Sequence, residues 1–194
     1  IRTEAFDESL LERVRRVDGV VEADGEMLFY AQVRSSEGDW KNILLQSLPE
    51  NGQQVDQIEL LEGRLPGERE LALDLHRDVG LSTGDPARIL LPSGTLKEIP
   101  VSGMVRDQTI GVSGTSYFVA PLQGYVPFES LPWFEQSQSY TMLLVRLDPE
   151  AAEDDVEILK EEITGLVQES GRAVTSIADL RPTAHPNSGY VTAM

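Results

Sequence analysis

The sequence predicts an α+β fold in which the two ends of the chain build one α/β layer and the middle forms an insertion. Three observations favour this fold class. The chain opens with an amphipathic helical segment and short strands, and it closes with a strong strand, a long amphipathic helix and a last short strand. Polar stretches with Pro and Gly separate these ends from the middle. We therefore expect a terminal subdomain of residues 1–47 plus 139–177, an inserted β-rich subdomain of residues 48–138, and a tail of residues 178–194.

The first part of the terminal subdomain is predicted to be a helix and three strands. Asp7 is a suitable N-cap residue, and the apolar side chains of residues 8–17 fall on one face of the helix that it would start. Apolar residues predict strands at Val20–Ala23, Met27–Val33 and Trp40–Gln46, separated by turns that contain Gly. We expect these strands to form a small sheet laid against the helix.

The second part of the terminal subdomain has a strand–helix–strand pattern. Tyr140–Leu147 is the strongest strand in the sequence, and Asp148 with Pro149 ends it. Apolar residues at helical spacing predict a helix over residues 150–169, and residues 173–177 predict a closing strand. This unit pairs naturally with the N-terminal helix and strands, which completes the layer built from both ends.

The inserted subdomain is predicted to contain short strands and turns. Residues 70–74 alternate as a strand does, and residues 87–91 and 96–105 read as the two strands of a hairpin. Gly103 lies inside the second hairpin strand, where a glycine usually marks a bulge or a close approach of two backbones. The other elements expected here are short helices at Val55–Leu61, at Leu75–Val79 and near Phe128, a strand at Tyr117–Ala120 and a turn at Pro121–Gly124.

The order of turns and strands between Glu59 and Asp107 carries a family resemblance. A Gly-Arg loop precedes a Glu that opens a short strand, a Gly-Leu-x-x-Gly-Asp turn follows, and the hairpin ends in Val-x-Gly-hydrophobic-Val-x-Asp. This order resembles the extracytoplasmic core domain of MacB-like ABC transporter permeases, a group that includes FtsX-like and lipoprotein-release permeases. The resemblance extends over residues 6–177. The matching residues are Gly63, Arg64, Glu70, Gly80, Leu81, Gly84, Asp85, Val101, Gly103, Val105 and Asp107.

The resemblance implies a fold, a location and a set of partners. The layer built from both chain ends would be porter-like, and the insertion would be a small mixed β/α, Sabre-like subdomain. The domain would lie on the extracytoplasmic side of the cell membrane between the first and second membrane helices of a permease, with residues 178–194 leading to the second helix. Its partners would be a cytoplasmic ABC ATPase, a second permease copy or homologue, and a peptide, lipoprotein or adaptor outside the membrane.

Composition restricts the function class. The chain carries 16 Lys and Arg against 33 Asp and Glu, a formal net charge of −17. This charge argues against nucleic acid and anionic lipid surfaces, because both attract basic proteins. The absence of cysteine excludes disulfides, thiolate catalysis and Cys-ligated zinc. No apolar run reaches the about 18 residues of a membrane span, and no signal peptide is visible. The chain starts on Ile, as expected of a segment cut from a longer protein.

The sequence predicts no catalytic, cofactor-binding or metal-ligating residues, and therefore no enzyme. His76 lies between Asp74 and Asp78, but alternate residues share a face only on a strand, and this piece is expected to be partly helical. Ser113 lacks the second Gly of a nucleophile elbow. Phosphate-binding Gly motifs are missing from the sequence, so the ATPase activity that the resemblance to ABC transporters implies is expected on a separate nucleotide-binding subunit or segment. The acidic residues 153–155 are explained by the dipole of the helix that they begin.

Tyr125, Phe128, Trp133 and Phe134 form the one aromatic-rich cluster and are the candidate contact residues. Core packing of the inserted subdomain would explain such a cluster. An exposed patch that binds a peptide, a lipid or a partner protein would explain it as well. The Gly-, Ser- and Thr-rich residues 109–116 are the second candidate contact segment.

Two functions are open at this point. The first is the extracytoplasmic domain of an ABC transporter permease, which couples cytoplasmic ATP-driven motion to substrate export or partner engagement outside the membrane. The second is a free-standing secreted ligand-binding protein or hydrolase. Apolar segments of about 20 residues on both sides of this chain in the full-length gene would favour the first.

Overall fold

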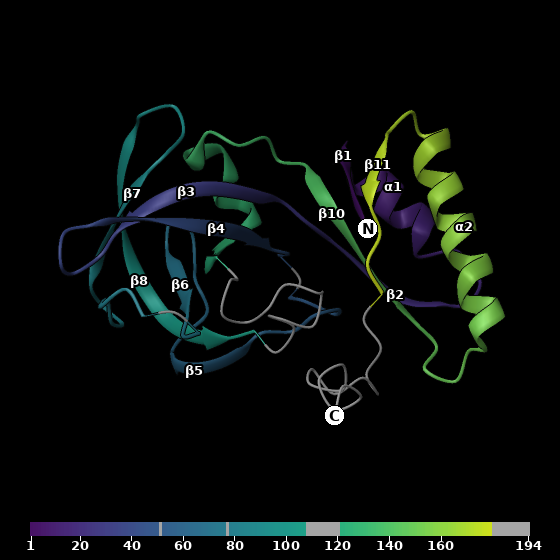
Figure 1. Cartoon of the computed structure of the whole chain (residues 1–194), viewed down its shortest axis with the longest axis horizontal. Helices are drawn as coiled ribbons and strands as arrows, with labels where there is room; N and C mark the ends of the chain where they lie inside the picture. Colours follow the sequence, from purple (N-terminus) through teal and green to yellow (C-terminus); the bar gives the residue numbers. More distant parts are fainter. Residues whose placement is uncertain (51, 77, 108–120, 180–194) are drawn as a thin grey trace, which may run out of the picture.

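The computed structural model describes residues 1–50, 52–76, 78–107 and 121–179. These residues form two β-sheets, a four-stranded terminal sheet that contains strands from both chain ends and a seven-stranded central sheet. Figure 1 shows the terminal sheet with its two helices on one side of the molecule and the central sheet on the other. The chain is thus a mixed, sheet-rich fold with few helices.

All neighbouring strands of the terminal sheet are antiparallel, in the order β11-β1-β10-β2. The predicted strands at its positions β2, β10 and β11 are confirmed. Strand β1 is not predicted, because its sequence RTEAF shows neither an apolar run nor a clean alternation. The elements of this half are β1 (Arg2–Phe6), α1 (Glu8–Val14), β2 (Val20–Glu26), β10 (Tyr140–Leu147), α2 (Glu153–Glu169) and β11 (Val174–Ser176).

Helices α1 and α2 cover one face of the terminal sheet and share an apolar core with β1 and β10 (Figure 1). Asp7 caps α1 as predicted, since its side chain accepts a hydrogen bond of 3.1 Å from the backbone N–H of Ser9. Helix α1 ends at Val14 rather than at Val17, and α2 begins at Glu153 rather than at residue 150. Both helices are therefore shorter than their apolar patterns predict.

The central sheet closes on itself through strand β8. Its order is β5-β8-β6-β9-β4-β3-β7, and because β7 also pairs with β8, the strands from β8 to β7 form a closed circuit, with β5 paired to β8 outside it. Two of the pairs are parallel, β4 with β9 and β6 with β8. The strands are β3 (Leu28–Arg34), β4 (Trp40–Leu48), β5 (Glu59–Gly63), β6 (Leu71–Asp74), β7 (Pro86–Leu90), β8 (Leu96–Arg106) and β9 (Leu122–Pro127).

This circuit of strands surrounds the largest apolar core of the described chain. Alternate side chains point inward from the strands, among them Val33 and Ile43, which have no exposed surface. The 3₁₀ helix η1 (Phe128–Phe134) adds Leu131 and Phe134 to the same core. The short helix predicted near Phe128 is confirmed as this element. Burial of apolar surface at these positions is the main term that stabilises the central sheet.

The prediction that β3 and β4 form a small sheet against the first helix is wrong. Both strands belong to the central sheet, where β4 pairs in parallel with β9 and β3 pairs with β7. Leu45 is fully buried there, in register with Gly124 of a strand almost 80 positions later in the chain. Strand β2 of the terminal sheet ends at Glu26 and strand β3 of the central sheet begins at Leu28, so the chain passes from one sheet to the other within two residues.

Three further local predictions are wrong, and partners distant in sequence explain them. The helix predicted at Val55–Leu61 is absent, and β5 begins at Glu59 because it pairs with β8. Residues 121–124, predicted as a turn, contain the start of β9, which pairs with β4 and β6. The described residues of the helix predicted at Leu75–Val79 form a turn and irregular chain instead. The strand predicted at Tyr117–Ala120 lies outside the described residues.

Candidate functional site: an acidic junction between the sheets

The four predicted contact residues lie in different surroundings. Tyr125 and Phe134 are 1% and 0% exposed, so neither side chain is available to a partner in this structure. Phe128 and Trp133 are partly buried at the two ends of η1. Contact with a partner therefore stays a prediction for Phe128 and Trp133, and the candidate segment 109–116 lies outside the described residues.

The aromatic rings of η1 make contacts at both ends of this helix, with the central sheet at one end and with the terminal sheet at the other. Phe134 packs against Trp133 with ring centroids 4.9 Å apart, and Lys97 Nζ lies 4.8 Å from the Trp133 ring centroid. At the other end, Phe128 stacks on Tyr140 of the terminal sheet at 4.8 Å. Helix η1 thus joins the core of the central sheet to a ring of the terminal sheet.

Several residues that carry the family resemblance have structural roles in backbone geometry. Gly63 has a φ of 73°, and a Cβ at Gly103 would lie 2.5 Å from the carbonyl oxygen of Arg64. The close approach predicted for Gly103 is therefore confirmed, and it comes with a register shift between β5 and β8. Arg64 forms a two-pronged ion pair with Glu70, which lowers the pKa of that carboxyl group and closes the loop between β5 and β6.

The last residue of the resemblance, Asp107, belongs to a buried polar network on the outer face of the central sheet. Its backbone N–H donates to Asp74 Oδ2 at 2.7 Å, and its side chain accepts a hydrogen bond of 3.0 Å from the Tyr125 hydroxyl. Asp74 Oδ1 in turn accepts from the backbone N–H of His76 at 2.7 Å and lies 2.5 Å from His76 Nδ1. Burial, followed by the charge of Asp107, raises the pKa of Tyr125, so this hydroxyl stays protonated and acts as a donor.

Two acidic residues of β2 extend this network to the terminal sheet. Asp24 is 3% exposed, and its Oδ2 accepts hydrogen bonds from the backbone N–H groups of Gln54 (2.6 Å) and Val55 (2.8 Å). It thereby fixes the segment between β4 and β5 against the terminal sheet. Glu26, two residues later, is 5% exposed, and its Oε1 accepts a hydrogen bond of 3.5 Å from the side-chain amide of Gln53.

Glu26 is surrounded by other acids. Burial in the first place, and then the charges of Asp56, Asp107 and Asp24, raise the pKa of Glu26 to about 8. The Glu26 carboxyl group is therefore mostly protonated at neutral pH. We call the set Asp24, Glu26, Asp56, Asp74 and Asp107 the acidic junction, because it lies where the chain passes from the terminal sheet to the central sheet.

The chemistry available at the acidic junction is the binding and release of a proton by Glu26. Within the described residues, no three His, Cys, Asp or Glu side chains converge so that they could hold a metal ion. His76, the one histidine whose placement is described, is oriented by Asp74 in the buried network and not toward a metal site. The acids of β2 are missed by the sequence analysis, although three acids at alternate positions of one strand, Glu22, Asp24 and Glu26, are an unusual pattern.

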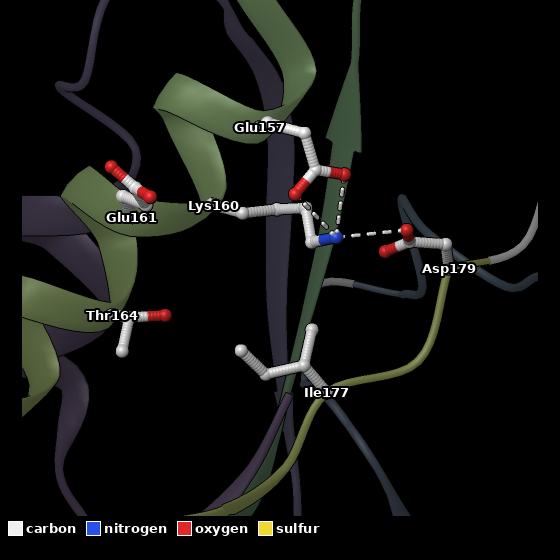
Figure 2. A pocket seen from close by; sticks show the side chains of 6 residues that line it. All are labelled: Glu157, Lys160, Glu161, Thr164, Ile177 and Asp179. Atoms are coloured by element: carbon white, nitrogen blue, oxygen red, sulfur yellow. Dashed lines mark hydrogen bonds and ion pairs between the residues drawn. The ribbon is translucent and has the colours of Figure 1, made fainter. Parts of the chain in front are cut away.

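A pocket of about 390 Å³ lies elsewhere, between α2 and the chain that follows β11 (Figure 2). Lys160 Nζ lies between the carboxylates of Glu157 and Asp179, at 2.9 Å from an oxygen of each. These hydrogen bonds, that of Glu157 first, raise the pKa of Lys160. The charge of Lys160 is thus already paired within the chain, and its contacts connect α2 to the segment that follows β11.

Comparisons with known proteins identify the fold. No protein-family model matches the chain, and no curated protein matches it in sequence. None of the helices in the described ranges is long and apolar enough to cross a membrane. The extracellular domain of YknZ, a noncanonical ABC-type transporter from Gram-positive bacteria, matches with a TM-score of 0.60 and 17% identity over 89% of this chain and 90% of that one.

Two further solved structures have the same fold. The periplasmic region of MacB from Actinobacillus actinomycetemcomitans matches with a TM-score of 0.54 and 12% identity, over 89% of this chain and 78% of that chain. A permease domain from Porphyromonas gingivalis matches with a TM-score of 0.50 and 13% identity, over 100% of this chain and 87% of that chain. The chain therefore has the fold of the MacB-like extracytoplasmic domains of ABC-type transporter permeases.

Proposed function

We propose that this chain is the extracytoplasmic domain of an ABC transporter permease and that it couples ATP-driven motion in the cytoplasm to substrate export or partner engagement outside the membrane. The observation that carries the proposal is the pairing of β1 with β11. Arg2 at the start of β1 lies opposite Ser176 at the end of β11, so the chain enters and leaves the fold side by side. A domain placed between two membrane helices needs this arrangement, because both of its ends connect to the same membrane.

The sheet topology supports the mechanical part of the proposal. Strand β10 pairs with β1 on one side and with β2 on the other, so a displacement of either chain end acts on a hydrogen-bonded sheet backed by two helices. Such a rigid layer rotates as one body when the helices attached to it move. We assign the porter-like role to the terminal sheet with α1 and α2, and the Sabre-like role to the central sheet, which would face away from the membrane.

The partners follow from the proposed placement. The ATPase would be a cytoplasmic ABC subunit or segment reached through the membrane helices, and a second permease copy or homologue would complete the transporter. Phe128 and Trp133, the partly exposed members of the aromatic cluster, are the proposed contacts for a peptide, lipoprotein or adaptor. No catalytic role is assigned to this chain.

Cysteine labelling in living cells tests the proposal, because the chain has no cysteine of its own. Glu37→Cys places a thiol on an exposed turn, and Val33→Cys places one in the fully buried core as the matched control. In cells that express the full-length protein, a membrane-impermeant maleimide should label Glu37→Cys but not Val33→Cys. The labelled protein should stay in the membrane fraction and co-purify with an ABC ATPase.

Two outcomes would contradict the proposal. Labelling of Glu37→Cys only after cell lysis would place this surface inside the cell. Release of the labelled protein into the medium or periplasm without membrane or ATPase would instead identify a free-standing secreted ligand-binding protein or hydrolase.

A further inference from the structure

We propose that a proton on Glu26 holds the terminal and central sheets in the arrangement of Figure 1, and that loss of this proton loosens the junction between them. The acidic junction would thus be a proton-dependent joint. The joint is built from residues of this chain alone, so it would operate in a secreted protein as well as in a permease domain.

The position of Glu26 is the first support. It is the last residue of β2, and the chain enters β3 of the other sheet two residues later, at Leu28. In the terminal sheet it lies opposite Met142 of β10. A change at Glu26 therefore acts at the point where the chain leaves the terminal sheet and enters the central sheet.

The surroundings of Glu26 are the second support. Its own strand contributes Asp24, the segment between β4 and β5 contributes Asp56 and the amide of Gln53, and the end of β8 contributes Asp107. In the described part of the chain, the charged groups that act on Glu26 are these three carboxylates, and no Lys, Arg or His donates to it. A neutral Glu26 fits this site, whereas a charged one would be a buried anion among anions.

The consequence of ionisation follows from the contacts. A negative Glu26 repels Asp56 and Asp107, which belong to the central side of the joint, and it draws water into a site that is 5% exposed. The contact released first should be the one that Asp24 makes with the backbone N–H groups of Gln54 and Val55, because this contact holds the same segment that carries Asp56. The connections left between the two sheets would include the chain itself, the stacking of Phe128 on Tyr140, and the hydrogen bond of 3.2 Å from the Leu28 backbone N–H to Thr141 Oγ1.

Distance measurements between two spin labels test the inference on the full chain. Glu37→Cys reports on the central sheet and Gln168→Cys, exposed on α2, reports on the terminal half. Between about pH 6 and about pH 9.5 the distance distribution should shift or broaden, with a midpoint near the Glu26 pKa of about 8. Adding Glu26→Gln, which cannot ionise, should keep the low-pH distribution throughout. Glu22→Gln, a partly exposed position on the same strand that faces Arg146, is the control and should shift like the parent.

Far-UV circular dichroism at both pH values distinguishes a change at the joint from unfolding, because secondary structure is retained only in the first case. A parent protein whose distances do not change in this range overturns the inference, and so does a shift of equal size in the Glu26→Gln protein. If Glu26→Gln does not fold, hydrogen exchange of the Gln54 and Val55 amides in the parent decides. Their exchange, corrected for the intrinsic pH dependence, should accelerate about tenfold or more across the same midpoint, and unchanged protection overturns the inference.

Discussion

Replacing Asp24 by Ala should destabilise the protein strongly, although Asp24 touches no catalytic group. Its Oδ2 accepts two backbone hydrogen bonds, at 2.6 Å from Gln54 and 2.8 Å from Val55, and the side chain is 3% exposed. Hydrogen bonds to a charged acceptor contribute about 1.5–3 kcal/mol each, and the two N–H groups would be left without this acceptor. We therefore expect the free energy of unfolding to fall by about 3–6 kcal/mol.

Urea denaturation followed by circular dichroism measures this loss. With a slope of about 2 kcal/mol per M for a chain of this size, the midpoint should fall by about 1.5–3 M. Asp24→Asn is the matched control, because it removes the charge but keeps an oxygen that can accept from the same N–H groups. It should lose less than half as much stability as Asp24→Ala. Hydrogen exchange at Gln54 and Val55 should accelerate far more in the Ala variant than in the Asn variant.

Two results would refute this reasoning. A loss below about 1 kcal/mol for Asp24→Ala would mean that the segment between β4 and β5 is held by other contacts. Equal losses for the Ala and Asn variants would mean that the charge of Asp24, and not its two hydrogen bonds, is what matters.

Three further predictions concern packing and pH. Gly103→Ala should lower the unfolding free energy by about 1–3 kcal/mol, because its Cβ would lie 2.5 Å from a backbone oxygen. Gly165→Ala in α2, which has open space around it, should raise stability by about 0.5–1 kcal/mol, and thermal unfolding compares the two. Phe134→Ala should cost about 3–5 kcal/mol in urea denaturation, and Trp133→Ala, at a partly exposed ring, clearly less; equal losses would contradict the burial argument. Since Glu26 keeps its proton in the folded state up to about pH 8 but releases it near 4.5 when unfolded, stability should fall as pH rises between these values, by at most about 1.4 kcal/mol per pH unit. Glu26→Gln should remove that part of the pH dependence, and an unchanged slope would show that Glu26 does not titrate as described.

Among the residues that carry the family resemblance, some have a role that the sequence predicts and others do not. Gly63 and Gly103 mark a position where two backbones meet too closely for a side chain. The sequence shows this requirement at Gly103 as a glycine inside a strand pattern, whereas Gly63 is expected in a loop. Asp107 ends the same pattern, but its role could not be inferred from it. Its partners, Asp74 and Tyr125, lie 33 and 18 positions away and become neighbours only when β6, β8 and β9 pair.

The aromatic cluster was found from composition, but composition could not tell which rings are accessible. Phe134 and Trp133 are adjacent in sequence, yet one is fully buried in the central core and the other is partly exposed beside Lys97. The difference comes from the turn of η1, which points neighbouring side chains in different directions. The residue type alone does not tell in which direction a side chain points.

The sequence by itself determined the local elements that have strong patterns, namely helices α1 and α2, strand β10 and the β7–β8 hairpin, because their apolar periodicity and turn residues act over a few positions. It also determined the acidic, cysteine-free character of the chain. Only the tertiary structure decided that β3 and β4 belong to the central sheet and that five acids gather where the two sheets meet. The physical reason is that strand partners are chosen by long-range pairing and shared burial, which no local pattern encodes. The same long-range packing turned Glu26 from an ordinary strand carboxylate into a buried acid that keeps its proton.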